Sequence, residues 1–243
     1  MTFKPTKYHL INCADSRKFE DEGWTLADPE ASAPSLVRAE YEIKQYNPRT
    51  DLDGFYRYAD WLPIKRTLTG SCAPVTYKSE NLAKELGLHN LYITLSGHYP
   101  EIGAAMETCS FKETEAYSVC ARLPEDNDKV LVVASAGNTA RAFAKVCSDN
   151  NIPLLISIPL DNINALWFKK PLNDCVKIIA SPAGSDYFDA IALSLISTHF
   201  TATLGIPLAS PILKGYSFES SSWVEPMDFT PDLHLRLHAL YTQ

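Results

Sequence analysis

Two short segments contain the residue types most able to do chemistry. The first, CSFKE at residues 109–113, places Lys112 near the start of an expected helix. The second, SAGNT at residues 135–139, stands where an apolar run ends and another helical pattern begins. A turn of this kind directs free backbone N–H groups and the positive end of the helix dipole to one point, which suits an anion. A lysine on a helix is more often a solvated surface residue, so both interpretations stay open on residue types alone.

The elements that must position these segments alternate regularly from residue 91 to 197. We expect strands at 91–95, 129–135, 153–158 and 176–180. We expect helices at 110–123 and 138–150, a less regular one at 162–172, and another at 187–197. Strand–helix–strand repetition at this spacing predicts parallel pairing with right-handed crossovers, and hence a three-layer α/β sandwich with a mostly parallel sheet. Ligands of such sheets bind at the carboxyl ends of the strands.

The helix expected at 138–150 has its own periodic signal. Ala140, Phe143, Ala144 and Cys147 recur at spacings of 3, 4 and 7 and form one apolar stripe. Since the helix begins directly after an expected strand, it fixes the SAGNT turn at the edge of the sheet.

Composition narrows the class of protein. The chain has 243 residues, of which 46% are hydrophobic and 21% charged, the balance of a globular protein. Its net charge of −7 and the lack of a basic cluster argue against a nucleic-acid partner. We find no signal peptide and no membrane-length apolar run, and we expect a cytoplasmic protein without a membrane partner. Six scattered cysteines lack metal-ligand spacing, so we expect no metal site.

Taken together, the two segments resemble those of threonine synthase and its relatives, which are fold-type II pyridoxal 5′-phosphate (PLP) enzymes with a tryptophan synthase β-like fold. These enzymes carry S-F-K, whose lysine bonds to PLP, and then S-x-G-N-T, which closes over the cofactor ring and the substrate carboxylate. This sequence has both motifs in the same order and at a similar separation. The segment at 69–95 also resembles the family's entry turn, helix and strand. The wording TCSFKETEA and the arm RYADWLPI at 57–64 are most similar to the cysteate synthase subfamily.

The resemblance implies a β-replacement in which PLP is the electron sink and O-phospho-L-serine and sulfite become L-cysteate and phosphate, in coenzyme M biosynthesis. Lys112 would be the catalytic residue: it holds PLP as an aldimine, is displaced by the substrate amine and then takes the α-proton, giving an aminoacrylate that sulfite attacks. Asn138 would hydrogen-bond the 3′-oxygen of PLP. Ser135, Gly137, Asn138 and Thr139 would cradle the substrate carboxylate, with Gly137 allowing close approach of the backbone.

The resemblance covers residues 8–197 and stops there. The family's later half supplies a glycine-rich loop that grips the PLP phosphate, and no G-x-G-x-G run occurs in this sequence. We therefore expect an incomplete version of the fold: an N-terminal arm at 1–66, an α/β PLP-binding region at 67–198 and a segment at 199–243 that does not match the family. Faces left uncovered would also favour a homo-oligomer.

Two alternative functions remain open. The chain is alternatively a truncated, catalytically inactive homologue that serves as a binding or regulatory protein, or is a gene remnant. A second alternative is a threonine synthase acting on O-phosphohomoserine. The sequence does not identify the residues that recognise the substrate phosphate or sulfite.

Overall fold

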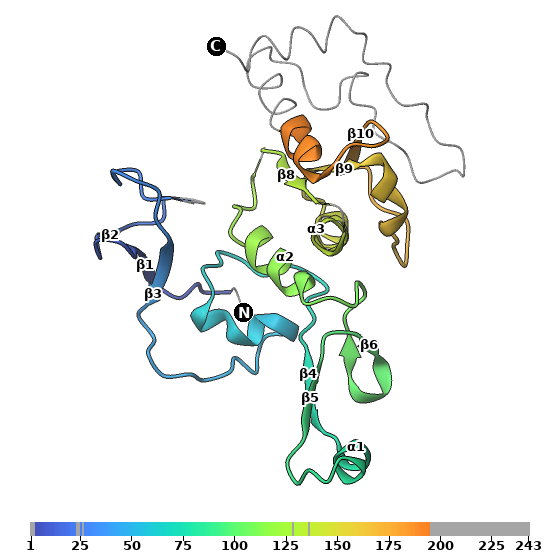
Figure 1. Cartoon of the computed structure of the whole chain (residues 1–243). Coiled ribbons are helices and arrows are strands. Elements are labelled where there is room, and N and C mark those ends of the chain that lie inside the picture. The colour runs from blue at the N-terminus through green and yellow to red at the C-terminus, as the bar shows by residue number, and fades with distance from the viewer. Residues whose placement is uncertain (1–2, 23–24, 26, 128, 136, 195–243) are drawn as a thin grey trace, which may run out of the picture.

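The computed structural model describes residues 3–22, 25, 27–127, 129–135 and 137–194. Within them lie an α/β body, a small N-terminal sheet and a β-ribbon that projects from the body (Figure 1). The expected C-terminal segment at 199–243 lies outside the described residues. None of the described helices has the length and apolarity needed to cross a bilayer.

The body contains a parallel three-stranded sheet in the order β10-β9-β8. Its strands are β8 (Leu131–Ala134), β9 (Leu154–Pro159) and β10 (Val176–Ser181). Both pairings are parallel. All six residues of the central strand β9 are buried, which explains why it reads as an unbroken apolar run. The parallel pairing predicted for these three strands is confirmed, whereas a three-layer sandwich stays a prediction.

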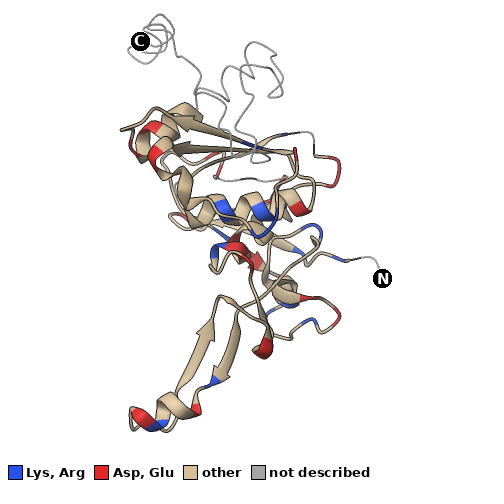
Figure 2. Ribbon diagram, turned by 90° about the vertical axis from the view of Figure 1, so that its right-hand side faces the viewer, with Lys and Arg blue, Asp and Glu red and all other residues tan. Residues whose placement is uncertain are grey.

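Two helices pack below this sheet. They are α2 (Lys112–Cys120) and α3 (Asn138–Asp149), and α3 connects β8 to β9. In Figures 1 and 2, α3 lies between the sheet and α2, and every residue from Ala140 to Ser148 is buried. The predicted apolar stripe of α3 therefore faces the core, and both predicted helices are confirmed.

The other two expected helices differ from their predictions. In place of a helix at 162–172 the chain forms a short 3₁₀ segment, η3 (Leu160–Ala165). Pro171 limits the last turn of the expected helix, because proline cannot donate the helical hydrogen bond and restricts the residue before it. Residues 187–194 are helical, and the rest of that expected helix lies outside the described part of the chain.

The predicted strand at 91–95 exists but belongs to another sheet. β5 (Tyr92–Leu95) pairs antiparallel with β4 (Val75–Lys78), and the short helix α1 (Glu80–Glu85) joins them. The expectation that this strand pairs in the parallel sheet is wrong. Residues 79–91 contain α1 and are long enough for a parallel crossover, so the length of the connection does not decide this pairing. The ribbon extends away from the body in Figure 2. A second small hairpin follows, made of β6 (His98–Tyr99), η2 (Pro100–Ile102) and β7 (Ala104–Ala105).

The N-terminal part forms an antiparallel sheet in the order β2-β1-β3. Its strands are β1 (Tyr8–Asn12), β2 (Lys18–Phe19) and β3 (Val37–Tyr41). The 3₁₀ helix η1 (Gly54–Trp61) then inserts Tyr56 and Ala59 into the core of the body. The N-terminal part is thus tied to the body through η1.

Candidate active site

Lys112 is the first residue of α2, at the end of a turn that begins at Thr108. Its amine nitrogen Nζ lies 2.6 Å from Oε2 of Glu115, one turn further along the helix. The Lys112 side chain is 33% exposed, so it is partly open to solvent. The sequence thus predicts correctly that this lysine opens a helix, and the structure adds Glu115 as its partner.

The SAGNT turn connects the end of β8 to the start of α3. The N–H of Ser135 donates to the carbonyl of Ser157 (3.1 Å), and the N–H of Gly137 donates to the Ser135 hydroxyl (3.4 Å). Asn138 is exposed, while Ser135 and Thr139 are partly exposed. The N–H groups of the first helical turn have no partner within a helix. The turn therefore presents polar groups to solvent at the carboxyl end of the sheet.

Open space lies above this turn. A side-chain carbon added to Gly137 would meet no atom within 4 Å. Beside the turn stands the helix at 187–194, since the hydroxyl of Tyr187 donates to the carbonyl of Ala134 (3.0 Å), the last residue of β8. Tyr187 is a neighbour of the site that sequence reasoning missed, because its hydroxyl contacts backbone and leaves no motif.

The two motifs lie at the starts of two helices that contact each other, and residues next to the motifs make the connection between them. α2 and α3 pack against each other. Within the described residues, the Lys112 amine pairs with Glu115 and lies over the Phe111 ring, and Asn138 has no hydrogen bond to it. A bond from Arg141 of α3 to the carbonyl of Thr108 is the contact between the two motif regions. The roles of Lys112, Ser135, Gly137, Asn138 and Thr139 stay predictions.

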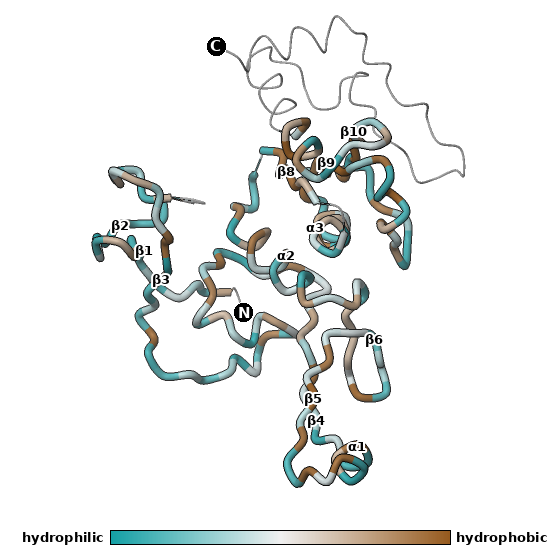
Figure 3. Tube along the Cα trace, viewed as in Figure 1, coloured by the Kyte–Doolittle hydropathy of each residue, from teal (hydrophilic) through white to brown (hydrophobic). Residues whose placement is uncertain are grey.

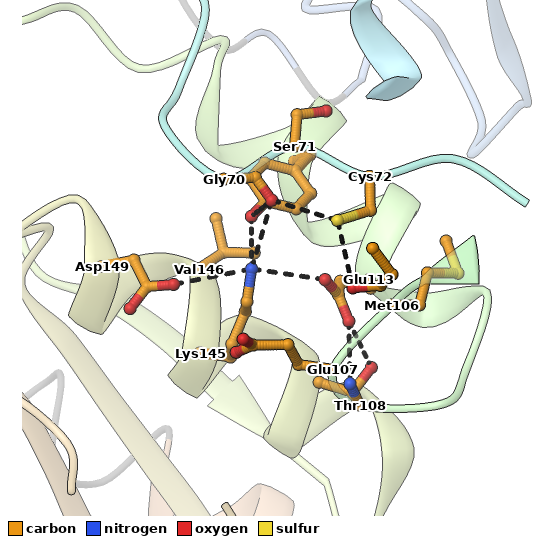
Figure 4. A network of polar contacts seen from close by, with 12 residues as sticks. Gly70, Ser71, Cys72, Met106, Glu107, Thr108, Glu113, Lys145, Val146 and Asp149 are labelled. Carbon is orange, nitrogen blue, oxygen red and sulfur yellow. Dashed lines mark hydrogen bonds and ion pairs between the residues drawn. The ribbon is translucent and has the colours of Figure 1, made fainter. Parts of the chain in front are cut away.

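A buried polar network at the α2–α3 contact was not predicted (Figure 4). Nζ of Lys145 lies 3.3 Å from Oε1 of Glu113 and 3.5 Å from Oδ2 of Asp149, and donates to the Tyr117 hydroxyl (2.5 Å). The side chains of Glu113 and Lys145 are 0% and 8% exposed. The available signal was the four-residue spacing of Glu113 to Tyr117 and of Lys145 to Asp149, which aligns charged and polar groups on facing helices.

The phenol of Tyr117 completes this network. Burial, and to a lesser degree the Glu113 carboxylate, raise the pKa of Tyr117 well above its ordinary value. The hydroxyl therefore stays protonated and donates to the carbonyl of Gly70 (2.5 Å) while it accepts from Lys145. The hydroxyl is thus used both as a donor and as an acceptor.

An open hollow of about 820 Å³ lies next to the network. It runs between residues 69–72 and 169–173, with Lys145, Ser148 and Asp149 on its wall. Its volume is in the range of small-molecule sites. Lys112 and Asn138 do not line it.

The residues present fit one end of PLP. Lys112, whose side chain is partly open to solvent, offers an amine for its aldehyde, and the exposed Asn138 stands beside the open space over Gly137. The residues do not supply the glycine-rich loop that holds the PLP phosphate in the family, because no two glycines in the sequence are separated by a single residue. The turn at 181–185 does not replace this loop as a phosphate site, since the N–H of Gly184 donates to the Asp161 carboxylate (2.8 Å). Among the described residues, no three metal-ligating side chains cluster.

These features define the class: a mixed α/β protein whose parallel sheet and helices are compatible with the fold of PLP enzymes. No known family model matches the chain. The chain is 44% identical to cysteate synthase of Methanocella paludicola over 188 residues, covering 76% of this chain and 43% of that protein. It is 46% identical over 160 residues to cysteate synthase of Methanosarcina acetivorans, covering 66% and 38%. The cysteate synthase of Methanocorpusculum labreanum is 36% identical over 210 residues, covering 86% and 47%.

The chain is therefore a relative of the cysteate synthases, which are enzymes, as its motifs predict. It spans less than half the length of these curated relatives.

Proposed function

We propose that this chain carries the PLP-bearing lysine of an enzyme that converts O-phospho-L-serine and sulfite to L-cysteate and phosphate. One observation carries the proposal: an S-F-K lysine and an S-x-G-N-T turn begin two contacting helices in a chain 36–46% identical to cysteate synthases. The three relatives described above are all named cysteate synthase, which favours O-phospho-L-serine and sulfite as the substrates over O-phosphohomoserine.

PLP, when bound, supplies the electron sink for chemistry at the substrate's Cα and Cβ. Lys112 would hold the cofactor through its amine nitrogen, and the same nitrogen would accept the α-proton of the substrate. Glu115 pairs with this amine at 2.6 Å, so the amine must leave the carboxylate before its lone pair can react.

The SAGNT turn orients the other reacting groups. Asn138 would donate to the 3′-oxygen of the cofactor ring, and the hydroxyls and backbone around Ser135, Gly137 and Thr139 would bind the substrate carboxylate. The supporting observations are the exposure of Asn138 and the open space over Gly137. The positive end of the α3 dipole favours an anion at the same place.

The second candidate is a catalytically inactive homologue that binds a partner. The observation behind it is that no G-x-G-x-G run occurs among these 243 residues. A phosphate without such a grip loses several charge-assisted hydrogen bonds, each worth about 1.5–3 kcal/mol. Covalent capture of PLP by Lys112 and turnover are therefore separate questions.

One experiment separates these candidates. The purified chain is incubated with PLP, reduced with borohydride and digested, and the pyridoxyl mass is mapped by mass spectrometry. We expect it on Lys112, its loss in Lys112→Ala and its retention in Lys84→Ala, a matched exposed lysine on α1. An equal yield in Lys112→Ala contradicts the proposal. Labelling of Lys112 without phosphate release from phosphoserine and sulfite favours the inactive homologue.

A further inference from the structure

The turn that leads into Lys112 is held at one residue, Thr108. Its N–H and its hydroxyl both donate to Oε2 of Glu113, each at 2.9 Å, and its carbonyl accepts from Arg141. Thr108 is 4% exposed and Glu113 is 0% exposed. Figure 4 shows the two bonds to Glu113. Every polar group of Thr108 is therefore used, on one side by α2 and on the other by α3.

Arg141 makes this contact without an acidic partner. Within the described part of the chain it forms no ion pair, and its Nε atom is buried without a hydrogen bond. The centre of its guanidinium group lies 3.9 Å from the centre of the Trp167 ring. Burial lowers the pKa of Arg141. Because a buried cation is costly unless it is paired, its bond to the Thr108 carbonyl and its stacking on Trp167 are the contacts that favour this position.

Glu113 is also tied to α3. Its second oxygen, Oε1, lies 3.3 Å from Nζ of Lys145, close enough for a Coulombic contact although the angle is not that of a hydrogen bond. The carboxylate next to Lys112 in sequence thus contacts both the preceding turn and the neighbouring helix.

The backbone between Thr108 and Lys112 requires such support. Cys109 has φ 52°, a left-handed conformation that residues other than glycine rarely adopt. Backbone of this kind persists where the surrounding structure holds it in place. Cys109 directly follows Thr108, so the hydrogen bonds that join Thr108 to Glu113 and Arg141 explain how the strained turn is maintained.

We propose that Glu113 and Arg141 are positioning residues for Lys112, which clamp Thr108 between α2 and α3 and so set the Lys112 amine relative to the SAGNT turn. Arg141 lies one helical turn after Asn138, so the clamp links the two motif regions through the first turns of α3. The inference rests on the proposed function, in which Lys112 binds PLP.

The test compares Thr108→Val, which removes the hydroxyl donor at nearly constant shape, with Thr108→Ser, which keeps it, and with Glu113→Gln. The first readout is the rate at which borohydride traps PLP on Lys112. We expect it to fall about tenfold in Thr108→Val and Glu113→Gln, since ångström-scale misplacement of a reacting group costs up to about a hundredfold. Thr108→Ser is expected to match the unmodified chain.

A second readout needs no cofactor. The rate at which Lys112 is acylated is measured against pH by mass spectrometry, with the exposed Lys84 as the internal reference. We expect the Lys112 profile to move relative to Lys84 in Thr108→Val and Glu113→Gln and to return in Thr108→Ser. If the unmodified chain traps no PLP, the proposed function fails while this readout still tests the clamp.

Ile156→Val, a mild core change on β9, controls for general loss of stability, and circular dichroism verifies folding. Should Glu113→Gln unfold, Thr108→Val alone decides. Both readouts unchanged in Thr108→Val would overturn the inference, as would equal changes in Ile156→Val.

Discussion

The body buries its apolar side chains, whereas the β4–α1–β5 ribbon leaves several large ones exposed. In the body, β9 is buried throughout, and the core cluster draws residues from η1, α2, α3 and the parallel sheet. No residue of the ribbon, 75–95, belongs to that cluster. The ribbon exposes large apolar side chains instead: Tyr77, Leu82, Leu86, Leu88 and Tyr92. Figure 3 shows hydrophobic segments both inside the body and on the projecting ribbon. Hydrophobic sequence is therefore no guide here to which region supplies the stability.

The largest contrast is expected from one substitution made in both regions. Lys145→Met leaves the Glu113 carboxylate buried without its cation, which should cost about 3–5 kcal/mol of unfolding free energy. Lys84→Met removes an exposed lysine of α1 and should change it by less than about 0.5 kcal/mol. Urea unfolding followed by circular dichroism measures both. Equal losses would mean that the network contributes no more than a surface charge.

An apolar pair sharpens the same comparison. Ile156→Ala empties a fully buried position of β9 and should cost about 2–5 kcal/mol, transfer and cavity included. Ile93→Ala in β5 should cost about 1 kcal/mol, because a half-buried side chain loses only part of the value of full burial. Thermal and urea unfolding of the two variants give the ratio. A larger loss from the ribbon variant would show that the ribbon is part of the folding core.

The joint between the N-terminal sheet and the body adds a dependence on pH. Burial by itself would raise the pKa of Asp21, but hydrogen bonds from the Tyr8 hydroxyl, the Thr25 N–H and Arg122 outweigh it and lower the pKa. A carboxyl whose pKa is lowered on folding stabilises above its unfolded pKa of about 3.9, and this contribution is lost as the pH falls through the folded value.

Asp21→Asn should therefore cost about 1.5–3 kcal/mol at pH 7, the range for hydrogen bonds to charged groups, and clearly less at pH 3. Urea unfolding at both pH values measures the difference. Glu85→Gln, at the end of α1, is the control and should leave the unfolding free energy unchanged at both pH 3 and pH 7. A loss for Asp21→Asn that is equal at pH 3 and pH 7 contradicts the assignment.

The smallest effect is expected at the tip of the ribbon. Leu86 is 59% exposed, so Leu86→Gln should alter the unfolding free energy by no more than about 0.5 kcal/mol. Urea unfolding of the isolated chain tests this. A loss comparable to that of Ile156→Ala would mean that this leucine is covered in solution.

The sequence by itself determined the local elements and the motifs. Strands β8, β9 and β10 follow from short apolar runs, and helix α3 follows from its apolar periodicity, because side-chain spacing along one segment decides which face can be buried. The S-F-K and S-x-G-N-T motifs likewise indicated the threonine synthase group, and the TCSFKETEA and RYADWLPI segments indicated the cysteate synthases within it, since a motif is read directly along the chain.

Only the tertiary structure decided how those elements meet. It placed β5 in an antiparallel ribbon, because strand partners depend on the path of the connection and not on the strand's own composition. It also buried Glu113, Arg141 and Lys145, which look like ordinary surface charges in sequence. The spacing of charged residues along a helix does not show whether their side faces solvent or the interior. The packing of α3 between the sheet and α2 determines that this side faces the interior.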